Sequence, residues 1–224
     1  MILANLHGHR VPATPRTTEA ICPTCAAPVI PKCGRINIWH WAHAAGQDCD
    51  PWAEPISAWH LNWQATVPTE RREVVIGNHR ADILTTTGII VEIQHSNISP
   101  DEIRARELHY GKMIWIFDTI NAAQPTEYEN HYDGTTRQTT RMAVPWSARL
   151  DIRTPERHPD PIYRTFRWKH ARKSIAACRA PVYLDLGDEL LRLGRIHPGP
   201  PCGGWGRIVT RQQLVDAFNA VVPS

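Results

Sequence analysis

Apolar and polar positions alternate most clearly in the middle of the chain, where they predict three strands. Residues 71–76 and 79–85 flank the turn pair Gly77-Asn78, and residues 89–96 follow a second turn that contains Gly88. Period-two alternation with β-branched side chains between glycine-containing turns is typical of β-hairpins. We therefore expect a three-stranded meander here.

A helix and a fourth strand are predicted directly after this meander. Ser99 is placed as an N-cap, Pro100 as the first helical residue, and Glu102 completes a capping box. Gly111 is a helix stop signal, and the wholly apolar residues 113–117 follow it as a buried strand. The central order is thus three strands, a helix and a strand.

The pattern is weaker elsewhere. We expect a helix within residues 53–66, strands at 181–186 and 206–209, and a last helix that begins after Thr210. Residues 119–160 are polar and punctuated by prolines, which predicts an irregular extension.

Composition limits the classes of protein to consider. The 224 residues are 42% hydrophobic and 21% charged, which excludes wholesale disorder. The sequence has no apolar run of about 18 residues and no apolar signal-peptide core at its start, so we expect a cytoplasmic protein without a membrane partner. Net charge is only +3, but residues 61–120 carry 8 acidic against 6 basic side chains, whereas residues 121–180 carry 6 against 11. This asymmetry is typical of carboxylates gathered in a site and cations gathered on a surface.

Four of the six cysteines and two histidines lie within a short N-terminal segment. Cys22 and Cys25 form a C-x2-C pair, and His40, His43 and Cys49 follow. Such a cluster predicts a structural Zn²⁺ site rather than disulfides in a reducing compartment. We favour Cys22, Cys25, His43 and Cys49 as ligands with His40 as the alternative ligand; buried free thiols and core histidines are the other interpretation.

Three oxygen-bearing side chains are expected to converge in the meander. Glu92 and Gln94 share a strand face, and a hairpin tip centred near Thr87 places Asp82 opposite Glu92. Two adjacent carboxylates repel each other unless a cation lies between them, and a hard ion such as Mg²⁺ takes oxygen ligands. The alternative is an ordinary exposed polar strand face.

The pattern is similar to the PD-(D/E)XK nuclease motif, with Gln94 at the lysine position. In such sites the Asp and Glu, here Asp82 and Glu92, hold the metal together with the main-chain carbonyl between Glu and Lys, here that of Ile93. The lysine orients the attacking water, which an uncharged glutamine amide can also do. Arg80, on the same strand face as Asp82, could supply the missing charge.

A longer series of motifs resembles the competence protein CoiA-like nuclease family over about residues 18–120. The matching segments are Cys22-Pro-x-x-Cys25, His40-Trp-Ala-His43 with Cys49, Ser57-x-x-His60-Leu61, Arg80-Ala-Asp82-Ile83, Val91-Glu92-Ile93-Gln94-His95-Ser96, Arg106-x-x-x-Tyr110 and Trp115-Ile116-x-Asp118. The resemblance implies a zinc-binding module joined to a PD-(D/E)XK-like core. It also implies a role on DNA in transformation and recombination, with recombination proteins as further partners.

The resemblance also implies roles for residues near the core. Ile56 replaces the glutamate that the family commonly has, and Glu54 is the nearest acidic substitute. His60 matches and could transfer protons, or it is a core histidine. Arg106 and Tyr110 share a helix face and either contact phosphate or buttress the strands.

Residues 164–179 form a basic stretch with six cations and no acid. Its interleaved cations and aromatics suit phosphate contact and base stacking, so we predict DNA binding. The residues concerned are Arg167, Trp168, Lys169, Arg172 and Lys173. The alternative is a solvated face whose aromatics are turned into the core.

Together these features predict an α/β fold: a zinc-binding hairpin module (1–50), a restriction-endonuclease-like PD-(D/E)XK mixed-sheet core (51–120) and a C-terminal α/β extension (121–224). The expected function is a Mg²⁺-dependent deoxyribonuclease with Asp82, Glu92, Gln94 and His60 at its site. The rivals are a non-cleaving DNA-binding or recombination adaptor and a zinc-stabilised protein-interaction module.

Overall fold

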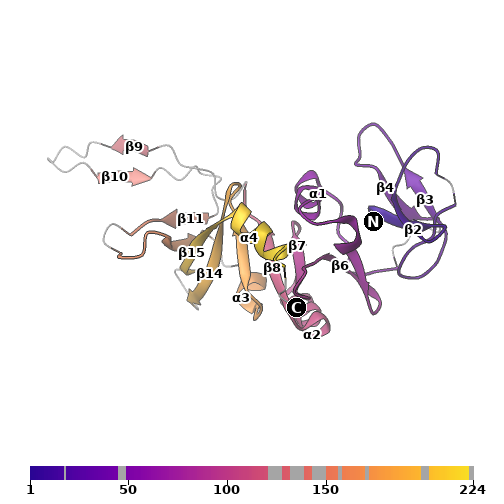
Figure 1. Cartoon of the computed structure of the whole chain (residues 1–224). Coiled ribbons are helices and arrows are strands. Elements are labelled where there is room, and N and C mark those ends of the chain that lie inside the picture. Colours follow the sequence, from indigo (N-terminus) through magenta and orange to yellow (C-terminus); the bar gives the residue numbers. More distant parts are fainter. Residues whose placement is uncertain are drawn as a thin grey trace. The chain divides into compact units, whose positions relative to one another are not determined.

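The computed structural model confirms the mixed α/β class, and its strands and helices are shown in Figure 1. It describes residues 1–17, 19–44, 49–120, 128–131, 139–142, 150–155, 158–169, 172–197 and 202–221. The chain divides into two units. Unit 1 comprises Met1–Asn97, Ala105–Trp115 and Gln212–Ser224, and unit 2 comprises Ile98–Arg104 and Ile116–Arg211. The specific PD-(D/E)XK core and the three predicted segment boundaries stay predictions.

Unit 1 begins with two antiparallel hairpins. Strand β1 (Leu3–Leu6) pairs with β2 (His9–Pro12), and β3 (Val29–Lys32) pairs with β4 (His40–His43). Their interior is small, because apart from Met1, Leu3, Val29 and Trp41 it is built mainly from alanines and Cys22. A segment with so little apolar volume needs further stabilisation, which a metal ion can supply.

The predicted meander follows in unit 1. Helix α1 (Ala58–Gln64) and the 3₁₀ turn η1 (Thr69–Arg71) lead into β5 (Arg72–Ile76), β6 (His79–Leu84) and β7 (Ile90–Gln94), which lie side by side in that order. Ile83 pairs with Val91 and Leu84 with Ile90, so the hairpin is centred on Thr87 as predicted. Gly77 and Gly88 take positive φ angles of 62° and 75° in the two turns, a conformation that glycine adopts without strain.

Helix α2 (Pro100–Tyr110) begins and ends where the sequence predicts. The Glu102 N–H donates to Ser99 Oγ at 3.1 Å, which is the N-cap bond. At the other end Gly111 has a φ of 66° and its N–H donates to the Glu107 carbonyl at 3.0 Å. Strand β8 (Met113–Asp118) then returns beside β7, with its first five residues buried.

Unit 2 is built on an antiparallel array in the order β11-β12-β15-β14-β13. The strands are β11 (Leu150–Arg153), β12 (Tyr163–Trp168), β13 (Val182–Asp185), β14 (Glu189–His197) and β15 (Gly203–Thr210), and β9 (Tyr128–His131) pairs separately with β10 (Thr139–Met142). Helix α3 (Lys173–Ala177) lies between β12 and β13 in sequence, and α4 (Arg211–Phe218) follows β15.

Two predictions for this part of the chain are wrong. The described parts of residues 119–160 contain strands β9, β10 and β11 rather than only irregular structure. Strand β12 runs through the basic stretch, and strand alternation turns Phe166 and Trp168 inward, each only 4% exposed. Trp168 is therefore not available to stack on bases.

No helix among the described residues is long and apolar enough to cross a membrane.

Candidate functional site

The predicted zinc ligands come together in the N-terminal hairpins. The ligand atoms of Cys22, Cys25, His43 and Cys49 all lie within 4.8 Å of one another. The two sulfurs of Cys22 and Cys49 are 3.7 Å apart, and Cys25 Sγ is 3.3 Å from His43 Nε2. A tetrahedral zinc with Zn–S bonds of about 2.3 Å sets its sulfurs about 3.8 Å apart. The cluster could therefore hold a metal ion such as zinc.

His40, the alternative ligand, lies outside this cluster. Its Nδ1 is 2.8 Å from the carbonyl oxygen of Ile38. Within the cluster, burial and the adjacent Cys25 and Cys22 raise the pKa of the Cys49 thiol to about 12, so its ionised form is disfavoured without a cation. Thiolates brought this close need a cation between them, which is consistent with the chemistry of a metal site.

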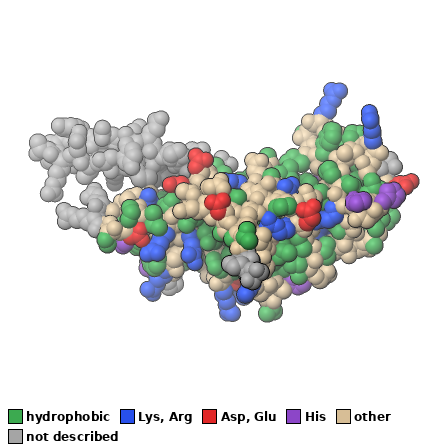
Figure 2. Space-filling view, in the orientation of Figure 1, with side chains coloured by type: hydrophobic (Ala, Val, Ile, Leu, Met, Phe, Trp, Pro, Cys, Tyr) green, Lys and Arg blue, Asp and Glu red, His purple; other side chains and the backbone are tan. Residues whose placement is uncertain are grey.

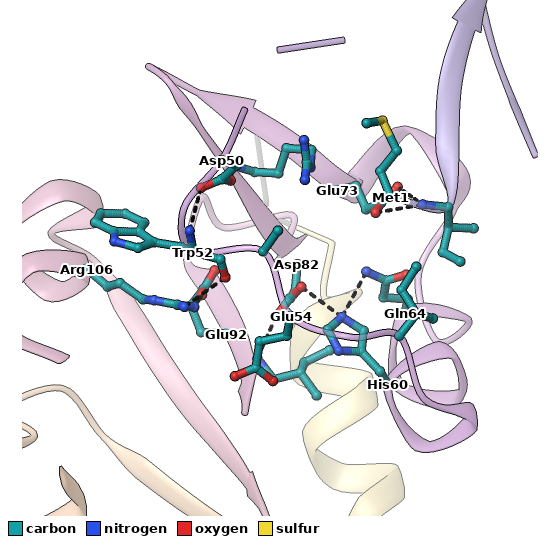
Figure 3. A pocket seen from close by; sticks show the side chains of 15 residues that line it. Met1, Asp50, Trp52, Glu54, His60, Gln64, Glu73, Asp82, Glu92 and Arg106 are labelled. Atoms are coloured by element: carbon teal, nitrogen blue, oxygen red, sulfur yellow. Dashed lines mark hydrogen bonds and ion pairs between the residues drawn. The ribbon is translucent and has the colours of Figure 1, made fainter. Parts of the chain in front are cut away.

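A second cluster lines a cavity of about 40 Å³ in unit 1 (Figure 3). Three carboxylates contribute to its wall: Glu54 from the loop before α1, Asp82 from β6 and Glu92 from β7. His60, Arg80, Ile93 and Arg106 line it as well. The structure thus brings most of the sequence-predicted site residues of the meander to one place.

Asp82 is held by two hydrogen bonds. Its Oδ1 lies 2.8 Å from His60 Nε2, and its Oδ2 accepts the Ile93 N–H at 2.8 Å. His60 reaches this position because Ser57 caps α1, accepting the His60 N–H at 3.2 Å. Burial lowers the pKa of His60, but the Asp82 charge and hydrogen bond outweigh it and raise that pKa to about 9. The His60 imidazole is therefore expected to be protonated at neutral pH.

Glu92 is only 2% exposed, and one of its two carboxylate oxygens has a hydrogen-bond partner. Its Oε2 accepts a hydrogen bond from Arg106 Nη1 at 2.7 Å, whereas its buried Oε1 has no hydrogen-bond partner. Burial and the charge of Asp82 raise the pKa of Glu92, against the opposing effect of Arg106. A buried carboxylate oxygen without a donor is costly, and a cation at this point would satisfy it.

Arg106 buttresses the strands. It is 4% exposed, and besides Glu92 it donates from Nη2 to the Trp52 carbonyl at 2.9 Å. Its guanidinium carbon lies 5.5 Å from the centre of the Trp52 ring. These contacts correspond to the buttressing role considered for Arg106 rather than to a phosphate contact.

Gln94 does not line the cavity itself but hydrogen-bonds Glu54, which does. Gln94 is 2% exposed, and its side-chain amide donates to Glu54 Oε1 and, at 3.1 Å, to the Ser96 carbonyl. The Ser96 hydroxyl also donates to Glu54, at 2.7 Å. Glu54 therefore supplies the third carboxylate that Ile56 cannot. Arg80, for its part, extends toward Cys49, with Nη1 3.9 Å from Sγ.

Sequence reasoning missed Glu73, which also lines the cavity. Its carboxylate accepts the N–H groups of Ile2 and Leu3 at 2.7–2.9 Å, and its φ is 45°. No local motif marks it, because its partners are about 70 residues away. Its oxygens are engaged by backbone amides, so its role is to connect β5 to β1.

The cations of the basic stretch lie in different surroundings. Arg167 and Lys169 are exposed on either side of the buried Trp168. Arg172 lies with its guanidinium 5.3 Å from the Trp168 ring, and Lys173 is the exposed first residue of α3. Its two aromatic side chains, Phe166 and Trp168, are turned into the core, as the alternative interpretation expects. DNA binding by the exposed cations stays a prediction.

Residues 7–51 match the family model described as competence protein CoiA, N-terminal domain. This match supports a CoiA-like family. The matched segment contains all four clustered ligands. The comparisons with curated proteins and with solved structures gave no match.

Proposed function

We propose that the chain is a Mg²⁺-dependent deoxyribonuclease whose site is the carboxylate cavity of unit 1. The observation that carries this proposal is the buried Glu92 Oε1, which lacks a hydrogen-bond partner and lies in the wall that Asp82 and Glu54 share. A structural polar cluster satisfies its buried atoms. An unsatisfied carboxylate oxygen among other carboxylates instead suits a hard divalent cation.

The donor set fits such an ion. Asp82 and Glu92 would hold it, with the Ile93 carbonyl as the third protein ligand that the motif implies. A magnesium ion supplies Lewis-acid stabilisation of charge on phosphate oxygens and lowers the pKa of bound water. The CoiA-like N-terminal match supports a setting in DNA processing, since that family is associated with competence.

The surrounding residues have separate tasks in this proposal. His60 fixes the Asp82 carboxylate through Oδ1 and holds a proton at Nε2, next to the reacting groups. Gln94 fixes Glu54, so Glu54 rather than Gln94 faces the cavity. Glu54 is then the group placed to accept a proton from an attacking water. Arg106 pairs with Glu92, and its charge opposes the rise in the pKa of that carboxyl.

Cleavage of supercoiled, linear and single-stranded DNA with Mg²⁺ or Mn²⁺ tests the proposal. Asp82→Asn and Glu92→Gln keep side-chain volume but remove an anionic ligand, so each should abolish cleavage. Calorimetric titration with Mn²⁺ should show binding to the wild type that both variants lose. Glu70→Gln, an exposed change outside the cavity, is the matched control and should leave both readouts intact.

Gln94→Lys should be tolerated, because lysine is the usual residue at this position and can pair with Glu54. Circular dichroism of each variant separates lost chemistry from lost folding. If the wild type binds no Mn²⁺ and cleaves no DNA form, the nuclease proposal is wrong. A DNA-binding adaptor with the same fold then takes its place.

A further inference from the structure

One face of the unit 2 sheet gathers arginines from four neighbouring strands. In an antiparallel sheet, directly opposed residues project to the same side. Thr165 on β12 is opposed by Arg153 on β11 and by Trp205 on β15, and Trp205 is in turn opposed by Arg195 on β14. The same rule places further arginines there: Arg167 opposes Asp151, and Arg207 opposes both Tyr163 and Arg192. We call this surface the arginine face.

The opposite side of these strands is the core side. Phe166 and Trp168 on β12 and Ile208 on β15 project there and are at most 7% exposed. The arginine face is different: Arg167, Arg192, Arg195 and Arg207 are exposed, and Tyr163 and Trp205 are half-buried. The face is therefore directed to solvent. In Figure 2, blue Lys and Arg side chains appear in the region of β14 and β15.

Aromatic rings form a row on the arginine face. His158 stacks on Tyr163 with ring centres 3.8 Å apart, and Tyr163 stacks against Trp205 at 5.7 Å. Gly194 makes room for Trp205, because a Cβ at Gly194 would lie 2.2 Å from the indole ring. The β14 backbone thus supports the indole, which leaves a flat aromatic surface between cations.

The charge on this face is only partly compensated. Asp151 pairs with Arg153 at 2.7 Å, and Asp160 pairs with Arg207 at 3.0 Å. No ion pair joins Arg167, Arg192 or Arg195 to another residue that the structure describes. Paired arginines are 64% and 61% exposed, so they too can reach an anion.

A hollow of about 330 Å³ lies on the same strands. It is lined by Arg153, Thr165, Arg167, His197 and Gly203 of the arginine face, together with Asp151, Phe166 and Gly204. Two arginines, a histidine and one carboxylate thus line a space of the size that a nucleotide needs.

We propose that the arginine face binds single-stranded nucleic acid, with bases stacked against the aromatic row that ends at Trp205 and phosphates paired to the surrounding arginines. Single-strand sites combine a cationic path for the backbone with aromatic side chains for the bases, and the arginine face has both. A duplex hides its base faces, so the aromatic rings of the arginine face add nothing to its binding. The proposal goes beyond cleavage in unit 1 and does not depend on it.

Fluorescence anisotropy of the full chain without added divalent metal tests this proposal. The probes are labelled oligo-dT and oligo-U of about 20 nucleotides, which exceeds the usual site size per domain, and a duplex of equal length. We expect both single strands to bind more tightly than the duplex. The ratio of the two affinities then assigns a preference for DNA or RNA.

Two variants locate the site. Arg192→Gln/Arg195→Gln should reduce the slope of log affinity against log salt by about 1.4, since each single-strand phosphate contact contributes about 0.7. Trp205→Leu should weaken binding roughly 5-fold to 150-fold, and Trp205→Phe should recover most of it. Arg16→Gln/Arg35→Gln changes charge equally at exposed positions of unit 1 and is the matched control.

Arg192 and Arg195 are exposed, so replacing them should leave the fold intact. The salt-slope measurement on that variant still tests the proposal if circular dichroism shows Trp205→Leu to be unfolded. The proposal is overturned if the duplex binds as tightly as the single strands. It is equally overturned if the control pair lowers the salt slope as much as the arginine-face pair, or if no oligonucleotide binds.

Discussion

Arg106 balances the charge of Glu92 in the wall of the carboxylate cavity. It is buried, and its guanidinium is bonded to Glu92 and to the Trp52 carbonyl. Arg106→Gln removes the cation and leaves a buried carboxylate without its partner, which typically costs about 3–5 kcal/mol. We expect the free energy of unfolding, measured by urea denaturation, to fall by about that amount.

Helix α2 offers a matched control for this prediction. Arg104 pairs with Asp101 at the surface, where the two side chains are 52% and 88% exposed, so Arg104→Gln should cost less than about 1 kcal/mol. Glu92→Gln/Arg106→Gln removes both charges together and should recover part of the loss. Equal effects of Arg104→Gln and Arg106→Gln would contradict the assigned buttressing role.

At the scale of residues, the sequence predicts a contact when a recognisable motif relates the two residues. It does not predict contacts that only the folded chain creates. The cluster of Cys22, Cys25, His43 and Cys49 could be predicted because metal geometry constrains both spacing and residue type. Glu54 meets Gln94 across 40 residues, and only the fold brings them together. Glu73 was missed for the same reason.

At the scale of elements, glycines control how closely β14 and β15 approach. A Cβ at Gly204 would lie 1.8 Å from the Arg195 carbonyl oxygen, which is backbone, whereas the three atoms nearest to one at Gly194 belong to the Trp205 ring. Gly204→Ala should therefore separate the strands and lower the unfolding free energy by roughly 1–3 kcal/mol or more. Gly194→Ala should displace the indole, with a smaller stability loss and weaker oligonucleotide binding.

Gly34→Ala is the control for both changes, because no heavy atom lies within 4 Å of its added Cβ and its φ is ordinary. It should alter the unfolding free energy by less than about 0.5 kcal/mol. Thermal and urea unfolding measure stability, and anisotropy measures oligonucleotide affinity. If the Gly194→Ala protein binds oligo-dT as tightly as the wild type, Trp205 does not stack on bases as proposed.

The same glycines explain which elements could be predicted. The meander and α2 carry strong local signals: alternation, turn glycines and the Ser99 cap. In β15, by contrast, only residues 206–209 were predicted as strand, because Gly203 and Gly204 are typical of a loop and glycine disfavours strands. The structure uses them where neighbouring backbone approaches closely. Strand β12 was not predicted, because the interleaved cations and aromatics of residues 164–179 were interpreted as a DNA-binding stretch rather than as the two faces of a strand.

At the scale of the whole molecule, the two units differ in what stabilises them. The hairpins of unit 1 have a small interior, and the clustered ligands Cys22, Cys25, His43 and Cys49 lie beside it. Unit 2 has an extended antiparallel array with buried leucines such as Leu184, Leu190 and Leu191. Among the described residues, no comparable Cys/His cluster occurs in unit 2. Metal removal should therefore act locally.

Hydrogen exchange after zinc chelation tests this expectation. Amides that bond within the N-terminal hairpins, such as those of Asn5, Cys22 and Val29, should lose protection because metal binding supplies folding energy there. Amides of β12, β14 and β15 should keep theirs. His43→Ala should reproduce the loss without chelator, whereas His40→Ala, which alters a histidine outside the cluster, should retain about one zinc per chain. Uniform loss of protection in both units would show instead that the ion stabilises the entire chain.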